Sequence, residues 1–172
     1  MNRLIPILFC LSVLVGCGKG YTDKSSSGEK VTAPVLSGKD SAPLVRKILC
    51  LHGGGGNAKE FQRSYGVKAL REALGSDYEL VFAQAPDGGL WMRDPPGGKS
   101  KPTTDPDWAS ESISILNSIV EEQGPFYGIL GYSQGAAFIP VYLSQIPDGT
   151  FQMAAMFGGY LPTTHQGLVS KI

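Results

Sequence analysis

The chain has 172 residues, of which 42% are hydrophobic, and its formal net charge at pH 7 is zero. This length and composition suffice for one packed domain, and the neutral balance argues against a nucleic-acid partner. The three cysteines, Cys10, Cys17 and Cys50, lack metal-ligand spacing, so we expect neither a metal site nor a disulfide framework.

Residues 1–17 have the features of a signal peptide. Leu4 to Val15 form an apolar run, shorter than the roughly 20 residues that span a bilayer and typical of a signal-peptide core. The run ends in Leu14-Val15-Gly16-Cys17, which resembles a bacterial lipobox with Cys17 as the lipidated residue. Residues 18–43, rich in Gly, Ser and Lys, predict a flexible tether. We therefore expect an exported lipoprotein, anchored to a membrane and facing the periplasm or the cell exterior; a secreted protein is the alternative.

The domain, residues 44–172, begins with an apolar segment from Val45 to Leu51, which predicts a parallel strand buried on both faces. Four consecutive glycines follow in His52-Gly53-Gly54-Gly55-Gly56-Asn57 and let backbone N–H groups approach a ligand closely. The spacing fits neither a P-loop nor a dinucleotide loop, and it favours the oxyanion loop of α/β-hydrolases. His52 is expected to support this turn by hydrogen bonding rather than to act as a base.

The rest of the domain alternates between helix and strand patterns. Residues 57–74, capped by Asn57, predict one helix with a kink, or two short helices, interrupted at Gly66. The further expected elements are a strand at 78–85, a helix from 105, a strand at 126–130, a helix at 136–145 and a strand at 151–157. This alternation predicts an α/β fold with a doubly wound, mostly parallel sheet.

Trp91 lies in the loop after the second strand. Open α/β sheets bind ligands outside the carboxyl ends of their strands. Trp91 is therefore expected either to line a substrate pocket, together with Tyr132, or to pack under its loop.

The segment Phe126 to Ala137 contains the pattern that indicates chemistry. An apolar strand runs into Gly131-Tyr132-Ser133-Gln134-Gly135, and a helix follows. The five-residue pattern alone is weak, because it occurs by chance in a chain with 23 glycines. The strand–turn–helix context is that of a G-x-S-x-G nucleophile elbow, with Ser133 as the nucleophile.

Four segments, LCLHGGGGNAKEF, FAQAP with its tryptophan loop, GILGYSQGAA and MFGGYLP, resemble in this order the FSH-type family of serine hydrolases of the α/β-hydrolase superfamily. The resemblance covers residues 45–162. It implies a cofactor-free enzyme that hydrolyses small carboxylic esters or thioesters through an acyl-enzyme on Ser133. It also implies that the backbone N–H groups of Gln134 and Gly54 form the oxyanion hole.

The family's catalytic aspartate and histidine follow the elbow after further strands. They are expected beyond Ile172, because His165 comes too early, so the domain is expected to be truncated at its C-terminus and to have little or no turnover by itself. Two alternatives remain open. One is a non-catalytic, membrane-anchored lipoprotein that keeps the fold as a binding module, and the other is a cutinase-like secreted polyester hydrolase.

Overall fold

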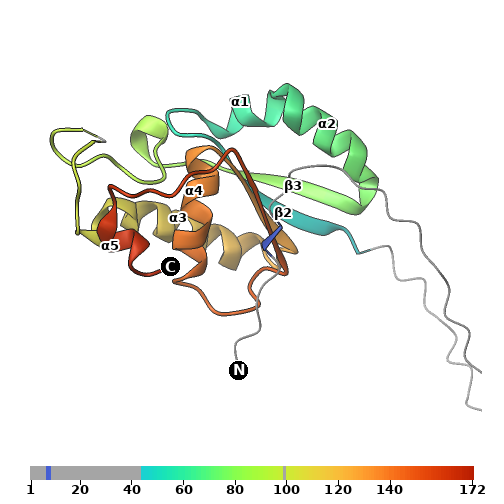
Figure 1. Cartoon of the computed structure of the whole chain (residues 1–172). Coiled ribbons are helices and arrows are strands. Elements are labelled where there is room, and N and C mark those ends of the chain that lie inside the picture. Colours follow the sequence, from blue (N-terminus) through green and yellow to red (C-terminus); the bar gives the residue numbers. More distant parts are fainter. Residues whose placement is uncertain (1–6, 9–43, 99) are drawn as a thin grey trace, which may run out of the picture.

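The computed structural model of the chain describes residues 7–8, 44–98 and 100–172 (Figure 1). Of the predicted signal peptide it describes only Ile7–Leu8, which form a short strand, β1. Cys17 and the predicted tether lie outside the described residues. No helix in the described ranges is long and apolar enough to cross a membrane.

The core of the domain is a parallel sheet in the order β1-β5-β4-β2-β3. The main strands are β2 (Arg46–Leu51), β3 (Tyr78–Ala83), β4 (Gly128–Tyr132) and β5 (Met153–Phe157). Because all strands run in the same direction, the loops after their carboxyl ends gather at one edge of the sheet. The predicted α/β fold of α/β-hydrolase type is confirmed, while its C-terminal truncation stays a prediction.

Helices cover both faces of the sheet, so the domain has three layers (Figure 1). Helices α1 (Ala58–Arg63) and α2 (Tyr65–Leu74) lie on one face. Helices α3 (Ser110–Gln123) and α4 (Gln134–Leu143) lie on the other. A last short helix, α5 (Gln166–Val169), follows the loop after β5.

Local caps explain where the helices begin. Asn57 caps α1 as expected, because its Oδ1 accepts from the Glu60 N–H at 2.9 Å. The predicted break at Gly66 is wrong by two residues: the chain is extended at Ser64, whose Oγ accepts from the Val67 N–H and starts α2. Asp105 accepts from the Asp107 N–H and opens a 3₁₀ turn, Pro106–Ala109, before α3.

Alternate residues of β2 point to opposite layers. Leu49 and Leu51 join the large core beneath α4, whereas Ile48 and Cys50 join a small cluster beneath α1 and α2. Cys50 is 1% exposed, and burial raises the pKa of its thiol to about 12. This thiol is a core group, as expected, because a reactive cysteine needs a lowered pKa.

Candidate active site

Ser133 lies at the sharp turn between β4 and α4. Its φ of 52° and ψ of −118° make it the one non-glycine residue in the described ranges with a positive φ. Its N–H donates to the Phe157 carbonyl at 2.9 Å, which ties the turn to β5. Such strained backbone persists where the surrounding structure fixes it, and it is concentrated at functional sites.

The two glycines of the elbow let the strand and the helix pass close together. A Cβ atom on Gly135 would lie 2.6 Å from the carbonyl oxygens of Leu51 and His52. A Cβ atom on Gly131 would lie 2.6 Å from the Ala136 nitrogen. No side chain fits at either position, so the G-x-S-x-G spacing is required by the backbone packing itself.

Gly54 and Gln134 lie next to each other beside Ser133. A Cβ atom on Gly54 would touch the Gln134 side chain at 3.1 Å. That side chain is fixed, because its Oε1 accepts from the Trp91 N–H at 2.8 Å and its Nε2 donates to the Met92 carbonyl at 3.1 Å.

The backbone N–H groups of these two residues remain available. No acceptor for the Gly54 N–H is found within the described part of the chain, and the Gln134 N–H, at the first residue of α4, lacks an intrahelical acceptor. Two such donors beside a serine hydroxyl are what an oxyanion hole requires.

His52 uses both ring nitrogens to hold the loop. Its Nδ1 donates to the Gly53 carbonyl at 2.8 Å, and its Nε2 accepts from the Ala85 N–H at 3.1 Å. The ring is 1% exposed, and burial lowers its pKa. A neutral ring with both nitrogens engaged cannot accept a proton from Ser133, which agrees with the structural role expected for His52.

Trp91 is fully buried. Its ring stacks on Phe138, with ring centroids 6.0 Å apart, and its Nε1 donates to the His52 carbonyl at 2.7 Å. Of the two alternatives that the sequence left open, the structure supports packing under the loop. The indole attaches the loop that contains Trp91 to the start of the glycine-rich loop, residues 53–56, and a role of Trp91 in a substrate pocket stays a prediction.

A cavity of about 440 Å³ opens in front of Ser133. Its lining residues come from the segments after β2, β3, β4 and β5: Gly54, Leu90, Asp94, Ser133, Gln134, Tyr160, Pro162, Thr164 and His165. The cavity thus combines the predicted nucleophile and oxyanion donors with three titratable side chains, Asp94, Tyr160 and His165, that the sequence did not assign to the site.

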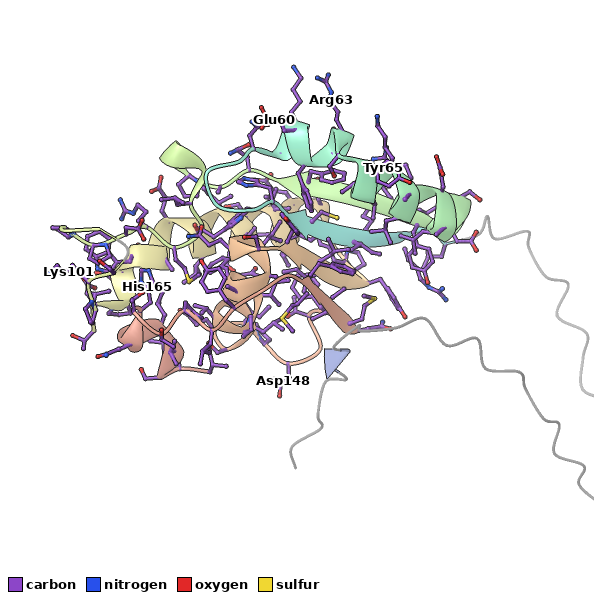
Figure 2. The ribbon with its side chains drawn as sticks, turned by 45° about the horizontal axis from the view of Figure 1, so that its top comes forward. Glu60, Arg63, Tyr65, Lys101, Asp148 and His165 are labelled. Carbon is purple, nitrogen blue, oxygen red and sulfur yellow. The ribbon has the colours of Figure 1, made fainter. Side chains whose placement is uncertain are left out.

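His165 is the unexpected member of this cavity (Figure 2). It is 5% exposed, and its buried Nδ1 has no hydrogen-bond partner. Burial lowers the pKa of its ring, while the nearby Asp94 acts in the opposite direction. No hydrogen bond from the described residues reaches Ser133 Oγ, so His165 does not hydrogen-bond the hydroxyl in this structure. Asp94 follows β3 and His165 follows β5. The rule that ligand sites lie beyond the carboxyl ends of parallel strands could therefore have identified both residues as candidates.

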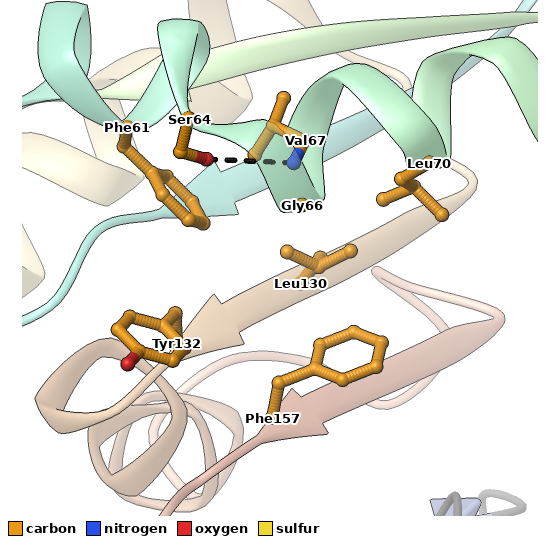
Figure 3. Close-up of a pocket in the computed structure, with 8 residues that line it drawn as sticks. All are labelled: Phe61, Ser64, Gly66, Val67, Leu70, Leu130, Tyr132 and Phe157. Atoms are coloured by element: carbon orange, nitrogen blue, oxygen red, sulfur yellow. Dashed lines mark hydrogen bonds between the residues drawn. The ribbon is translucent and has the colours of Figure 1, made fainter.

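Tyr132 belongs to a different cavity (Figure 3). An apolar groove of about 610 Å³ lies between α2 and strands β4 and β5, lined by Phe61, Ser64, Gly66, Val67, Leu70, Leu130, Tyr132 and Phe157. Tyr132 stacks on Phe61 with ring centroids 6.3 Å apart and is 53% exposed. Tyr132 lines this groove and is not among the residues that line the cavity in front of Ser133, so its role in a substrate pocket stays a prediction. No metal-binding cluster is found among the residues that the structure describes.

Comparisons with known proteins agree with this geometry. The sequence model of a family described as "Serine hydrolase (FSH1)" matches residues 90–166. The chain is 29% identical over 143 residues to "Probable esterase azaC" of Aspergillus niger, covering 70% of this chain and 53% of that protein. It is 28% identical over 148 residues to "Esterase OVCA2" of Danio rerio (66% and 64%). It is 34% identical over 137 residues to "Esterase FPY3" of Fusarium mangiferae (71% and 61%). The match thus spans between about half and two thirds of the length of these relatives.

Proposed function

The chain belongs to the FSH1 family of serine hydrolases, and from this membership we propose that it hydrolyses carboxylic esters or thioesters with Ser133 as the nucleophile. One observation carries the proposal. The strained elbow places Ser133 in a cavity that also contains the free N–H groups of Gly54 and Gln134. This combination suits acyl transfer, in which a hydroxyl attacks a carbonyl and the carbonyl oxygen becomes negative.

The proposed reaction has two halves. A general base removes the proton from Ser133 Oγ as the oxygen attacks the carbonyl carbon, and the N–H groups of Gly54 and Gln134 stabilise the oxyanion, each by roughly 3–4 kcal/mol. The tetrahedral intermediate collapses to an acyl-enzyme as the protonated base gives its proton to the leaving alcohol or thiol. A water molecule, deprotonated by the same base, then attacks the acyl-enzyme and releases the acid and Ser133.

We propose that the triad aspartate and histidine lie beyond Ile172. Two observations support this. Both ring nitrogens of His52 are engaged elsewhere, and no described residue hydrogen-bonds Ser133 Oγ. Without a base, a serine hydroxyl is a poor nucleophile, so we expect very slow turnover from the 172-residue chain. The comparisons, which name esterases, give no support to a non-catalytic binding module or a cutinase-like hydrolase.

Anchoring of the protein through Cys17 is a separate proposal. The lipobox-like sequence Leu14-Val15-Gly16-Cys17 supports it, and a lipid on the cysteine would hold the domain at a membrane surface. Mass spectrometry of the mature N-terminus, in a bacterial host that processes lipoproteins, should find a diacylglyceryl group on Cys17 and none after Cys17→Ser.

Labelling by a fluorophosphonate probe tests the role of Ser133. We expect the 172-residue chain to react slowly, and added imidazole to accelerate the reaction because it supplies a base that can enter the open cavity. Ser133→Ala should abolish labelling, whereas Ser144→Ala, at the exposed end of α4, should not change it. A folded chain in which Ser133 never reacts would contradict the proposed nucleophile. Fast labelling without imidazole would instead show that the base lies within these 172 residues.

A further inference from the structure

The side chain of Gln134 joins the nucleophile elbow to the loop after β3. Its Oε1 accepts from the Trp91 N–H at 2.8 Å, and its Nε2 donates to the Met92 carbonyl at 3.1 Å. Trp91 is 0% exposed and Met92 is 1% exposed. Because both are buried, loss of the carboxamide would leave a buried donor and a buried acceptor without partners. The carboxamide thus pairs with this loop as a neighbouring strand would.

The hydrogen bonds at Trp91 and Met92 also determine what the loop presents to the nucleophile. The side chains of Trp91 and Met92 belong to the buried core. Leu90, just before them, and Asp94, just after them, line the cavity in front of Ser133. A shift of the two paired residues would therefore move this wall of the cavity.

The glycine-rich loop lies against the same carboxamide. A Cβ atom on Gly54 would lie 3.1 Å from both Cδ and Oε1 of Gln134, so the Gly54 backbone packs directly on this side chain. The Gly55 N–H donates to the Gly89 carbonyl at 2.9 Å, which joins the glycine-rich loop to the loop after β3 as well. Both loops thus meet the elbow at the Gln134 side chain, beside the two backbone donors of the oxyanion hole.

We propose that the carboxamide of Gln134 is a positioning group for the reaction of Ser133. It holds the Gly54 N–H at the place where the oxyanion forms, and it holds Leu90 in the wall of the cavity. The inference rests on the proposed function, in which only the backbone N–H of Gln134 has a role, and adds a role for the side chain. Such a role matters because a displacement of about 1 Å near a catalytic group can reduce a rate by about 100-fold.

Glutamate at this position would separate hydrogen bonding from mere filling of space. A protonated carboxyl has the shape of the carboxamide, with a carbonyl oxygen for the Trp91 N–H and a hydroxyl for the Met92 carbonyl. An ionised carboxylate has no donor, so its second oxygen would face the Met92 carbonyl and repel it. Gln134→Glu therefore changes between a paired and an unpaired state within one protein as the pH changes.

Fluorophosphonate labelling of the full 172-residue chain, with imidazole present, measures the effect on Ser133. The rate constant of Gln134→Glu is divided by that of the unmodified chain at the same pH, which cancels the titration of imidazole. We expect a ratio of about 0.1 at about pH 8, which rises toward 1 as the pH falls to about 5.5 and the protonated carboxyl restores both bonds.

Two further variants frame this result. Gln134→Met fills a similar volume without the two hydrogen bonds, so its ratio should stay at about 0.1 over the same pH range. Gln152→Glu is the matched control, because Gln152 is exposed and directly precedes β5, at the edge of the sheet opposite to the site. Its labelling rate should equal that of the unmodified chain at every pH.

Amide chemical shifts measured by NMR test the positioning without any reaction. In Gln134→Glu, the amide signals of Trp91, Leu90 and Gly54 should all titrate with the introduced carboxyl, over the pH range in which the labelling ratio changes. The same signals should not show this titration in the unmodified chain or in Gln152→Glu. A side chain that only filled space would leave the Gly54 and Leu90 signals uncoupled from the carboxyl.

Three results would overturn the inference: a labelling ratio of Gln134→Glu that is independent of pH, a Gln134→Met chain as reactive as the unmodified one, or Gly54 and Leu90 amides that do not follow the carboxyl. Urea unfolding at each pH restricts the comparison to folded chains. If Gln134→Glu unfolds at alkaline pH, Gln134→Met provides the unpaired state. Failure of the proposed function looks different: Ser133 of the unmodified chain would not react at any pH, while the shared titration of the three amides in Gln134→Glu would persist.

Discussion

Two residues of the site, Ser133 and His52, are held in conformations that only their surroundings explain. Ser133 has a backbone conformation that favours glycine, and it is fixed there by α4 on one side and by the Phe157 carbonyl on the other. His52 is buried at the start of the glycine-rich loop that approaches Ser133. The strain at Ser133 and the burial of His52 should therefore each affect the free energy of unfolding.

Replacing Ser133 should reveal the strain of the elbow. A non-glycine residue in such a conformation destabilises the folded state by about 1–3 kcal/mol. Glycine avoids this strain, but the greater flexibility that it gives the unfolded chain cancels about 0.5–1 kcal/mol of the stability gained. Ser133→Gly should therefore be more stable to urea than Ser133→Ala by about 1 kcal/mol. Equal stability, or a less stable glycine variant, would show that the surrounding structure does not strain this turn.

The buried His52 should make the fold sensitive to mild acid. Burial lowers the pKa of His52 below its ordinary value of 6.5, so below about pH 6.5 the unfolded chain binds a proton that the folded chain resists. Stability is therefore complete above this pH and is lost as the pH falls toward the lower pKa of the folded state. The test uses a His165→Leu background, which removes the other histidine with a lowered pKa. There the urea concentration at the unfolding midpoint should decrease when the pH is lowered from about 7.5 to about 5.5. Adding His52→Gln should flatten this dependence; a midpoint that rises on acidification would contradict the assignment.

At the scale of elements, the site depends on how closely a strand, a helix and a loop approach one another. The start of α4 lies against the end of β2, with Gly135 at the contact. The glycine-rich loop is joined to the tryptophan loop by the Gly55 N–H, which donates to the Gly89 carbonyl at 2.9 Å. The catalytic geometry thus results from backbone contacts between elements rather than from any one of them.

Two glycine-to-alanine substitutions should have opposite effects. Gly135→Ala places a methyl group 2.6 Å from two carbonyl oxygens, so it should destabilise the fold by about 2–4 kcal/mol, as severe overpacking does. Gly66→Ala meets no atom within 4 Å and lies in α2, so it should stabilise by about 0.5–1 kcal/mol. Chemical denaturation of both variants measures the difference. Similar effects from the two substitutions would show that the close approach at the elbow is not maintained in solution.

The sequence was sufficient to predict the elements that have a local cause. The strand–turn–helix order around Ser133, the Asn57 cap and the parallel sheet follow from apolar patterns, glycine spacing and capping side chains. The helix break was placed at Gly66 instead of Ser64, because glycine signals flexibility, whereas the break is made by the Ser64 hydroxyl that caps the next helix.

Long-range packing decided the parts that the sequence could not predict. Trp91 and Tyr132 both lie next to strand ends, and only the folded packing shows that one is buried and the other faces a groove across the sheet. Asp94 and His165 are distant in sequence but line the same cavity, and a bridge between Thr103 and His165 joins their two loops. A single sequence has no local signal that pairs these two loops, although the position of both loops after strands places them at the same edge of the sheet.

On the scale of the whole molecule, the two layers of helices are unequally anchored to the sheet. Helix α4 has eight buried residues, whereas α1 has none and α2 has only Val67. Beneath α1 and α2 the fully buried cluster consists of Ile48, Cys50 and Leu130, and the apolar groove extends beside it (Figure 3). The layer that holds the nucleophile is therefore the more firmly packed of the two.

Native-state hydrogen exchange should show that the α1–α2 layer opens first. Local opening requires less free energy where few apolar contacts are buried, so the amides of α1 and α2 should exchange at free energies at least roughly 2 kcal/mol below those of α4. Gly66→Ala gives a matched test, because it should raise the opening free energy of α2 and leave that of α4 unchanged unless the two layers open together. Exchange of both layers at one common free energy would mean that the domain unfolds as a single unit. The elbow would then owe its rigidity to global stability and not to the denser packing beneath α4.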